Sequence, residues 1–228
     1  MILSLPDLKE LSIEDYSATL EQPLPTYSVI PQGEPLNSLE LHGNVGGIGE
    51  VLAKSRFTSS RLSLDVWIPN VEQLLILSSE TVVELKLYGV WFSRFPDRAE
   101  TIAIDLPDTL VEGIPPPIHL PPLPALTTLV IYHYEDHPSP HLTNILCSIG
   151  SAPVLTSIAI ENTDWIYIEH LPLADLWVDV DRWLSRIAKH AGVKGGLPLT
   201  LRRWSVWEGF LPEFRESGGK IKPEYSDW

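Results

Sequence analysis

The sequence predicts an α/β fold, an irregular solenoid with a parallel sheet on its concave side and helices and loops on its convex side. Three observations lead to this prediction. A short leucine frame recurs along the chain, proline-rich connectors separate some of its copies, and amphipathic helical segments lie between others. One such unit cannot bury its apolar face alone, whereas a stack of units can.

The repeated frame is L-x-x-L-x-L, and residues 36–44, LNSLELHGN, also carry the asparagine of the leucine-rich-repeat frame. In L-x-L both apolar side chains point to one face of a strand, and the residues between and beside them point to the other. Most intervals between copies fall in or near the window of roughly 20–29 residues that is typical of leucine-rich repeats. Anchored on its second apolar residue, the frame recurs at Leu11, Leu39, Leu62, Leu85, Ile102 (a weak copy), Leu129, Ile158, Leu199 and Ile221.

The connecting segments agree with this prediction. Proline runs at 115–117 and 121–124 suit neither a helix interior nor a central strand, so they indicate extended connectors. Helices are predicted over 48–56, 140–152, 179–190 and 208–217, and the third has a helical stripe at Val180, Trp183, Leu184 and Ile187. An ordinary α/β domain with chance L-x-L runs is the alternative. It is less favoured because the copies keep one register.

We expect a single leucine-rich-repeat-like domain over residues 1–228. It would have an irregular N-terminal edge over about residues 1–35 and a capping segment over about residues 197–228, where Trp204, Trp207 and Trp228 gather. The frame begins by residue 5 with no polar cap before it. We therefore expect either that the chain begins inside a larger architecture or that residues 14–35 fold back over this end.

Composition narrows the classes of partner. The net charge is −14, and the acidic excess lies before residue 182, so we expect no nucleic-acid partner. No apolar run reaches the roughly 18 residues of a membrane span, and no secretory signal is found, so we expect no membrane partner. The single cysteine, Cys147, favours a reducing intracellular compartment, cytoplasmic or nuclear. We expect a monomer.

The order of several motifs resembles the C-terminal leucine-rich-repeat region of the F-box proteins of mushroom-forming fungi (basidiomycetes). The motifs are LPALTTLVIYH, HLTNILCSIGSAPVLTSIAIEN, VDRWLSRIAKHA and LTLRRW…FLPEFRESGGKIKPEY, and they are clearest over residues 120–225. The resemblance implies repeats that hold the substrate of a cullin-type ubiquitin ligase. The F-box itself, with its L-P-x-E-[LI]-L-like start, is not found here. The only early L-P, Leu5–Pro6, belongs to a repeat strand, so ligase recruitment is not carried over to any residue.

No motif predicts catalysis, a metal site or a cofactor, and we expect that the chain is not an enzyme. The glycine-rich stretch 43–52 matches neither the dinucleotide fingerprint nor the P-loop. Residues 133–141, HYEDHPSPH, are expected to form a polar loop. Cys147 is expected to be buried on an apolar helix face, and Asp175, Asp179 and Asp181 to form a solvated helix start.

The register instead predicts a binding surface on the concave face. We expect a protein or peptide partner, basic in character, because acids are frequent there and two tyrosines lie near the middle. The alternatives are a face that is merely solvated, and a truncated, non-catalytic structural remnant with no ligase role. The predicted partner-binding residues are Glu40, Asp65, Glu84, Tyr88, Asp105, Tyr132, His133 and Glu161.

Overall fold

A computed structural model describes residues 9–15, 35–43, 52–54, 56–66, 71–90, 118–133, 140–149, 152–162, 177–204 and 209–224. The strands are β1 (Glu10–Asp15), β2 (Leu36–Gly43), β3 (Ser59–Asp65), β4 (Glu84–Val90), β5 (Thr128–His133), β6 (Ser157–Asn162), β7 (Pro198–Arg202) and β8 (Lys220–Glu224). The helices are α2 (Val71–Ser78), α4 (Pro140–Ser148), α5 (Val178–Ala191) and α6 (Pro212–Glu216). No helix in these ranges is long and apolar enough to cross a membrane.

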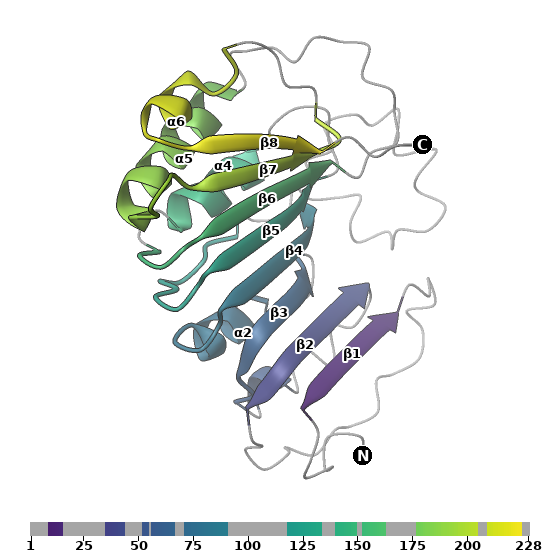
Figure 1. Cartoon of the computed structure of the whole chain (residues 1–228). Coiled ribbons are helices and arrows are strands. Elements are labelled where there is room, and N and C mark those ends of the chain that lie inside the picture. The colour runs from purple at the N-terminus through teal and green to yellow at the C-terminus, as the bar shows by residue number, and fades with distance from the viewer. Residues whose placement is uncertain are drawn as a thin grey trace, which may run out of the picture.

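The strands form one open parallel sheet, and their order in space is their order in the chain (Figure 1). Each strand pairs in parallel only with the strand before it and the strand after it. All of these pairings are parallel and join consecutive strands, which gives a solenoid-like α/β arrangement.

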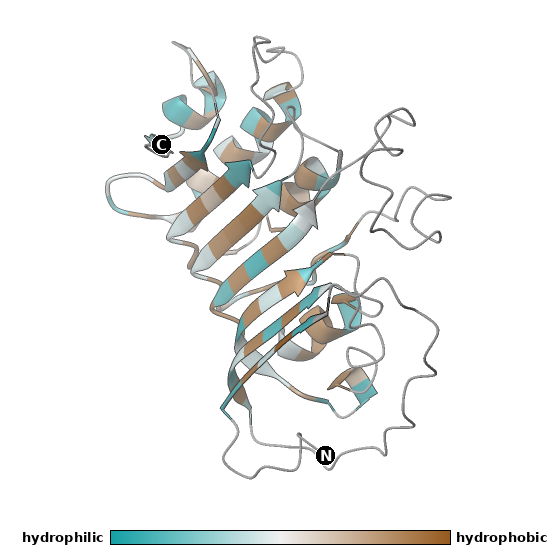
Figure 2. Ribbon diagram, turned by 90° about the vertical axis from the view of Figure 1, so that its right-hand side faces the viewer, coloured by the Kyte–Doolittle hydropathy of each residue, from teal (hydrophilic) through white to brown (hydrophobic). Residues whose placement is uncertain are grey.

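The predicted leucine frame sets the register of the described sheet. One core row consists of Leu11, Leu39, Leu62, Leu85, Leu129, Ile158, Leu199 and Ile221, and the next of Ile13, Leu41, Leu64, Leu87, Ile131, Ile160, Leu201 and Pro223. Most of these side chains are buried, and Figure 2 shows apolar bands that continue from strand to strand.

The copy at Ile102 is the exception. It lies outside the described residues, but β4 pairs directly with β5, with Leu85 opposite Leu129.

The helices lie on one face of the sheet (Figures 1 and 2). Three predicted helices are found as α4, α5 and α6, and residues 52–54 are helical within the predicted segment 48–56. Helix α2 was missed because residues 74–77, LLIL, form an unbroken apolar run, and such a run does not distinguish a helix from a buried strand.

The ends of α5 follow the predicted chemistry. Asp179 and Asp181 lie in its first turn, and Lys189 and His190 lie in its last, so charges of the favourable sign face both ends of the helix dipole. Gly192 ends the helix in the left-handed conformation, with φ of 59°.

Asp181 does not form a solvated helix start, and that prediction was wrong. Its side chain is buried, and its carboxylate accepts hydrogen bonds from the backbone N–H groups of Glu213 (3.0 Å) and Phe214 (2.8 Å). Asp181 thus satisfies two N–H groups in the first turn of α6, which have no partner within that helix. Burial raises the pKa of this carboxyl group, and the two backbone hydrogen bonds oppose the rise.

Aromatic residues fill the core behind β5–β7. Trp204, predicted to cap the stack, is buried and meets Trp177 in an edge-on contact with ring centroids 4.9 Å apart. Phe210 packs edge-on against Trp177 at 4.8 Å. Among the described residues, the indole N–H groups of both tryptophans have no hydrogen-bond partner, so apolar and ring contacts hold these side chains in place. The other two tryptophans of the predicted cap, Trp207 and Trp228, lie outside the described residues.

A ladder of hydroxyl groups joins the segments that enter the strands. Ser60 Oγ donates to the carbonyl of Asn37 (2.9 Å), Thr127 Oγ1 to that of Val83 (2.9 Å), and Thr156 Oγ1 to that of Thr127 (3.0 Å). Val83 occupies the equivalent position before β4 and has no hydroxyl group. Only its backbone N–H reaches the carbonyl of Ser60, at 2.8 Å.

Candidate functional site

The open face of the sheet is the face on which the side chains between and beside the core rows lie. It is organised in three rows that cross the strands. The entry row contains Glu10, Ser38, Arg61, Glu84, Thr128, Ser157, Pro198 and Lys220. The central row contains Ser12, Glu40, Ser63, Lys86, Val130, Ala159, Thr200 and Lys222. The carboxyl-end row contains Glu14, His42, Asp65, Tyr88, Tyr132, Glu161, Arg202 and Glu224.

The middle of the carboxyl-end row is an aromatic stack. The rings of Tyr88 and Tyr132 are nearly parallel, with centroids 4.0 Å apart and an interplanar angle of 10°. The His42 ring meets Tyr88 edge-on at 4.5 Å. Both tyrosines are half-buried, so each keeps some surface in contact with solvent. Burial, followed by a hydrogen bond to Tyr132, raises the pKa of Tyr88 well above its ordinary value.

His42 connects this stack to β3. Its Nε2 atom lies 3.2 Å from Ser63 Oγ, and its Nδ1 atom lies 3.7 Å from Asp65 Oδ1. The other carboxylate oxygen of Asp65 accepts a hydrogen bond from the backbone N–H of Gly43 at 2.6 Å. Three neighbouring strands therefore hold one another through side chains as well as through the backbone.

Serine, histidine and aspartate in this order are also the components of a nucleophilic triad. Acyl transfer additionally needs hydrogen-bond donors for the oxyanion, which backbone N–H groups usually supply. Ser63 lies within a strand that is paired on both sides, where the N–H groups point along the plane of the sheet rather than above its face. The arrangement therefore fits a side-chain network better than an acyl-transfer site. Among the described residues, no group of three or more metal-ligating side chains is present.

The β6–β8 part of the carboxyl-end row is a chain of ion pairs. Arg202 donates from Nε to Glu224 Oε2 (2.8 Å) and from Nη1 to Glu161 Oε2 (3.2 Å). These hydrogen bonds, that to Glu224 first, raise the pKa of the Arg202 guanidinium. Glu161 is thus already paired within the sheet.

Glu84 is also paired. Its carboxylate lies 3.3 Å from Lys86 Nζ and 3.8 Å from Arg61 Nε. Glu40, by contrast, accepts a hydrogen bond from the neutral Ser12 Oγ at 3.1 Å. The acids of the open face therefore differ in how much of their charge remains for a partner.

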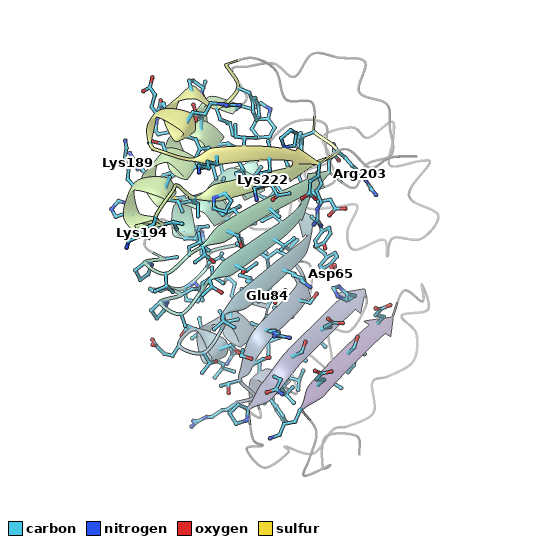
Figure 3. The ribbon with its side chains drawn as sticks, in the orientation of Figure 1. Asp65, Glu84, Lys189, Lys194, Arg203 and Lys222 are labelled. Carbon is cyan, nitrogen blue, oxygen red and sulfur yellow. The ribbon has the colours of Figure 1, made fainter. Side chains whose placement is uncertain are left out.

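Six of the eight predicted binding residues lie on the open face: Glu40, Asp65, Glu84, Tyr88, Tyr132 and Glu161. Figure 3 shows Asp65 and Glu84 over the sheet and Lys222 on its β8 side. Asp105 lies outside the described residues. His133 was placed wrongly: its side chain is fully buried near Trp204, because it follows the tyrosine position by one residue and so points to the core side.

The predicted binding set omitted three residues that shape this surface: His42, Ser63 and Arg202. The frame could have found Arg202, since it follows Leu199-x-Leu201 directly, as Glu161 follows its own L-x-L-type pair. The contacts of His42 depend on how side chains on three strands meet, which spacing along the chain does not reveal.

Comparisons with family models, with curated proteins and with solved structures found no match to this chain.

Proposed function

We propose that the chain is a protein-binding leucine-rich-repeat module and that its partner lies on the open face. The L-x-L frame, its register across the sheet and the sequential order of the strands support the repeat assignment. The helices lie behind the sheet, so among the described elements they leave the opposite face open to a partner (Figure 1).

The Tyr88–Tyr132 stack carries the proposal. Tyrosines are enriched among the residues that contribute most to binding energy at protein interfaces. Here both rings are held by each other, by His42 and by the paired strands before any partner arrives. Binding would thus cost little side-chain entropy, which favours affinity.

The resemblance to fungal F-box proteins suggests the biological role. We propose that the open face holds a protein substrate, as the substrate-recognition part of an F-box-type ubiquitin ligase receptor. Ligase recruitment is assigned to none of the described residues.

A capture experiment tests the binding role. Wild type, Tyr132→Ala and the control Ile76→Ala would be immobilised, and proteins retained from a fungal lysate would be quantified. Ile76 is the matched control because it is a large apolar residue, 59% exposed, on helix α2. We expect a set of proteins retained by wild type and Ile76→Ala and lost by Tyr132→Ala. Equal retention by all three, or none by any, would contradict the proposal and favour a structural remnant.

A further inference from the structure

The charges on the open face are distributed unevenly from strand to strand. At the N-terminal side, β1 and β2 present Glu10, Glu14 and Glu40, and no ion pair to these three carboxylates occurs among the described residues. Lys9, directly before β1, is the nearest basic residue along the chain to Glu10 and Glu14, and the three carboxylates outnumber it. This end of the open face is therefore acidic.

The middle of the open face is close to electrical balance. The two carboxylates of Asp65 and Glu84 are matched in number by Arg61 and Lys86, and strand β5 presents only Thr128, Val130 and Tyr132. Along the central row, the short side chains of Val130, Ala159 and Thr200 follow one another and are partly exposed. These three short side chains on β5, β6 and β7 leave a shallow surface beside the Tyr132 ring, which we call the β5–β7 floor.

The opposite end of the open face has a basic excess. Strand β8 presents Lys220 and Lys222, both exposed, whereas its acid, Glu224, is already bonded to Arg202. Figure 3 shows Lys222 at the end of the sheet away from β1.

The acidic end at β1–β2 and the basic end at β8 are too far apart for one charge on a partner to interact with both. Neighbouring strands lie roughly 4.8 Å apart, so seven steps place β8 roughly 34 Å from β1. This distance is several times the Debye length of about 8 Å at physiological ionic strength. A partner that complements both ends must therefore carry its own charges in separate places along its length.

We infer that the open face binds one polypeptide segment that crosses the strands, with basic side chains over β1–β2, an apolar side chain over the β5–β7 floor and acidic side chains over β8. This inference rests on the proposed binding function and adds the polarity of the partner to it. About ten residues of extended chain at roughly 3.3 Å each would span the face. Asp65, Glu84 and Glu161, which were expected to attract a basic partner, are already engaged within the sheet.

A peptide-display selection on the full chain tests this polarity. A library of random 16-residue peptides would be selected against wild type, against an acid-end variant (Glu10→Lys, Glu14→Lys and Glu40→Lys) and against a basic-end variant (Lys220→Glu and Lys222→Glu). The control variant would reverse three exposed acids that lie off the open face, Glu80→Lys, Asp179→Lys and Glu216→Lys. It changes the net charge as much as the acid-end variant does.

We expect wild type and the control variant to enrich peptides that are basic at one end and acidic at the other, with an apolar residue between. The acid-end variant should bind these peptides about tenfold or more weakly, because three attractive charge pairs become repulsive ones. Peptides selected by the basic-end variant should lose the acidic residues at one end and keep the basic residues and the apolar residue.

Three results would overturn the inference, and they differ in meaning. Peptides that are lost on Tyr132→Ala but show no charge polarity would refute the polarity and leave the binding function intact. Failure to enrich any peptide that depends on Tyr132 would count against both proposals. An equal loss of affinity in the acid-end and control variants would show that net charge, rather than its position on the open face, governs binding.

Discussion

Replacing Asp181 with alanine should destabilise the chain by about 2–4 kcal/mol. The carboxylate accepts two backbone hydrogen bonds, at 2.8 and 3.0 Å, from the first turn of α6. Hydrogen bonds to charged groups are worth about 1.5–3 kcal/mol each, and a buried N–H group left without a partner costs about 1–3 kcal/mol. Burial of the charge outweighs these bonds and raises the pKa of Asp181, so we expect a value below the sum of two full bonds, set mainly by the two N–H groups that lose their partner.

The matched control is Asp179→Ala. Asp179 lies in the same first turn of α5, but it is exposed and bonds to Arg182 at 2.7 Å. A surface pair of this kind contributes roughly 0–1 kcal/mol. Urea unfolding followed by tryptophan fluorescence would measure both free energies of unfolding. In a chain of this size, the Asp181→Ala loss corresponds to a fall in Tm of about 4–16 °C. If the two variants differ by less than about 0.5 kcal/mol, Asp181 does not hold α6.

The same group predicts a dependence of stability on pH. Because the pKa of Asp181 is raised in the folded state, folding takes up a proton between the ordinary and the raised value. The contribution of Asp181 is therefore full below the ordinary value, about 3.9, and falls as the pH rises through this window. The stability difference between wild type and Asp181→Asn, measured by urea unfolding, should shrink from acid pH towards neutral pH. A difference that grows with pH would show that the hydrogen bonds to the carboxylate outweigh burial.

Three further predictions concern the sheet and its connections. Val83→Thr should stabilise the chain by about 0.5–1.5 kcal/mol in urea unfolding, because its hydroxyl would complete the ladder at the carbonyl of Ser60; no gain would show that this carbonyl is out of reach. Gly196→Ala should lower the free energy of unfolding by at least about 2 kcal/mol, because φ is +91° and the new methyl group would overlap the carbonyl of Gly218. A smaller loss in thermal unfolding would show that the backbone of this turn shifts to make room. Tyr88→Phe should flatten the loss of stability above about pH 10, since the raised pKa keeps the folded Tyr88 phenol protonated while the unfolded one ionises. Equal slopes in alkaline urea titrations would contradict this.

The strands could be predicted from the sequence because their pattern is local. Alternation around Leu39 and Leu41, or around Leu129 and Ile131, requires only that one face of each strand be buried. The copy at Ile102 lies outside the described residues, and the same pattern does not say whether a segment joins the sheet. Helix α2 was missed for a related reason, since its apolar run suits either a helix or a strand.

Burial within a helix was predicted less well than burial within a strand. Cys147 was expected to be buried but is exposed, whereas Leu142, Ile145, Leu146 and Ile149 form the buried stripe. These four residues follow the i, i+3, i+4, i+7 spacing, and Cys147 lies outside it. A stricter use of that spacing would have placed Cys147 correctly.

The candidate site could be predicted only as a row of positions. The frame placed Tyr88, Tyr132 and Glu161 on one face, and their neighbours across the strands then decide what each can do. The pairing of Glu161 with Arg202 joins residues 41 positions apart, and the bond from Phe214 to Asp181 joins residues 33 apart. Such contacts depend on the lengths of the connections, which the sequence pattern does not determine.

The sequential order of the strands has a consequence for how the chain is made. Each strand needs only its predecessor as a template, so the sheet can lengthen in step with synthesis, without waiting for a distant segment. Protection of backbone amides from hydrogen exchange should then decline from β4–β6 towards both edges, because an edge strand has one neighbour instead of two. A defect in a central strand would separate the two halves, whereas a defect in β1 or β8 would only shorten the stack.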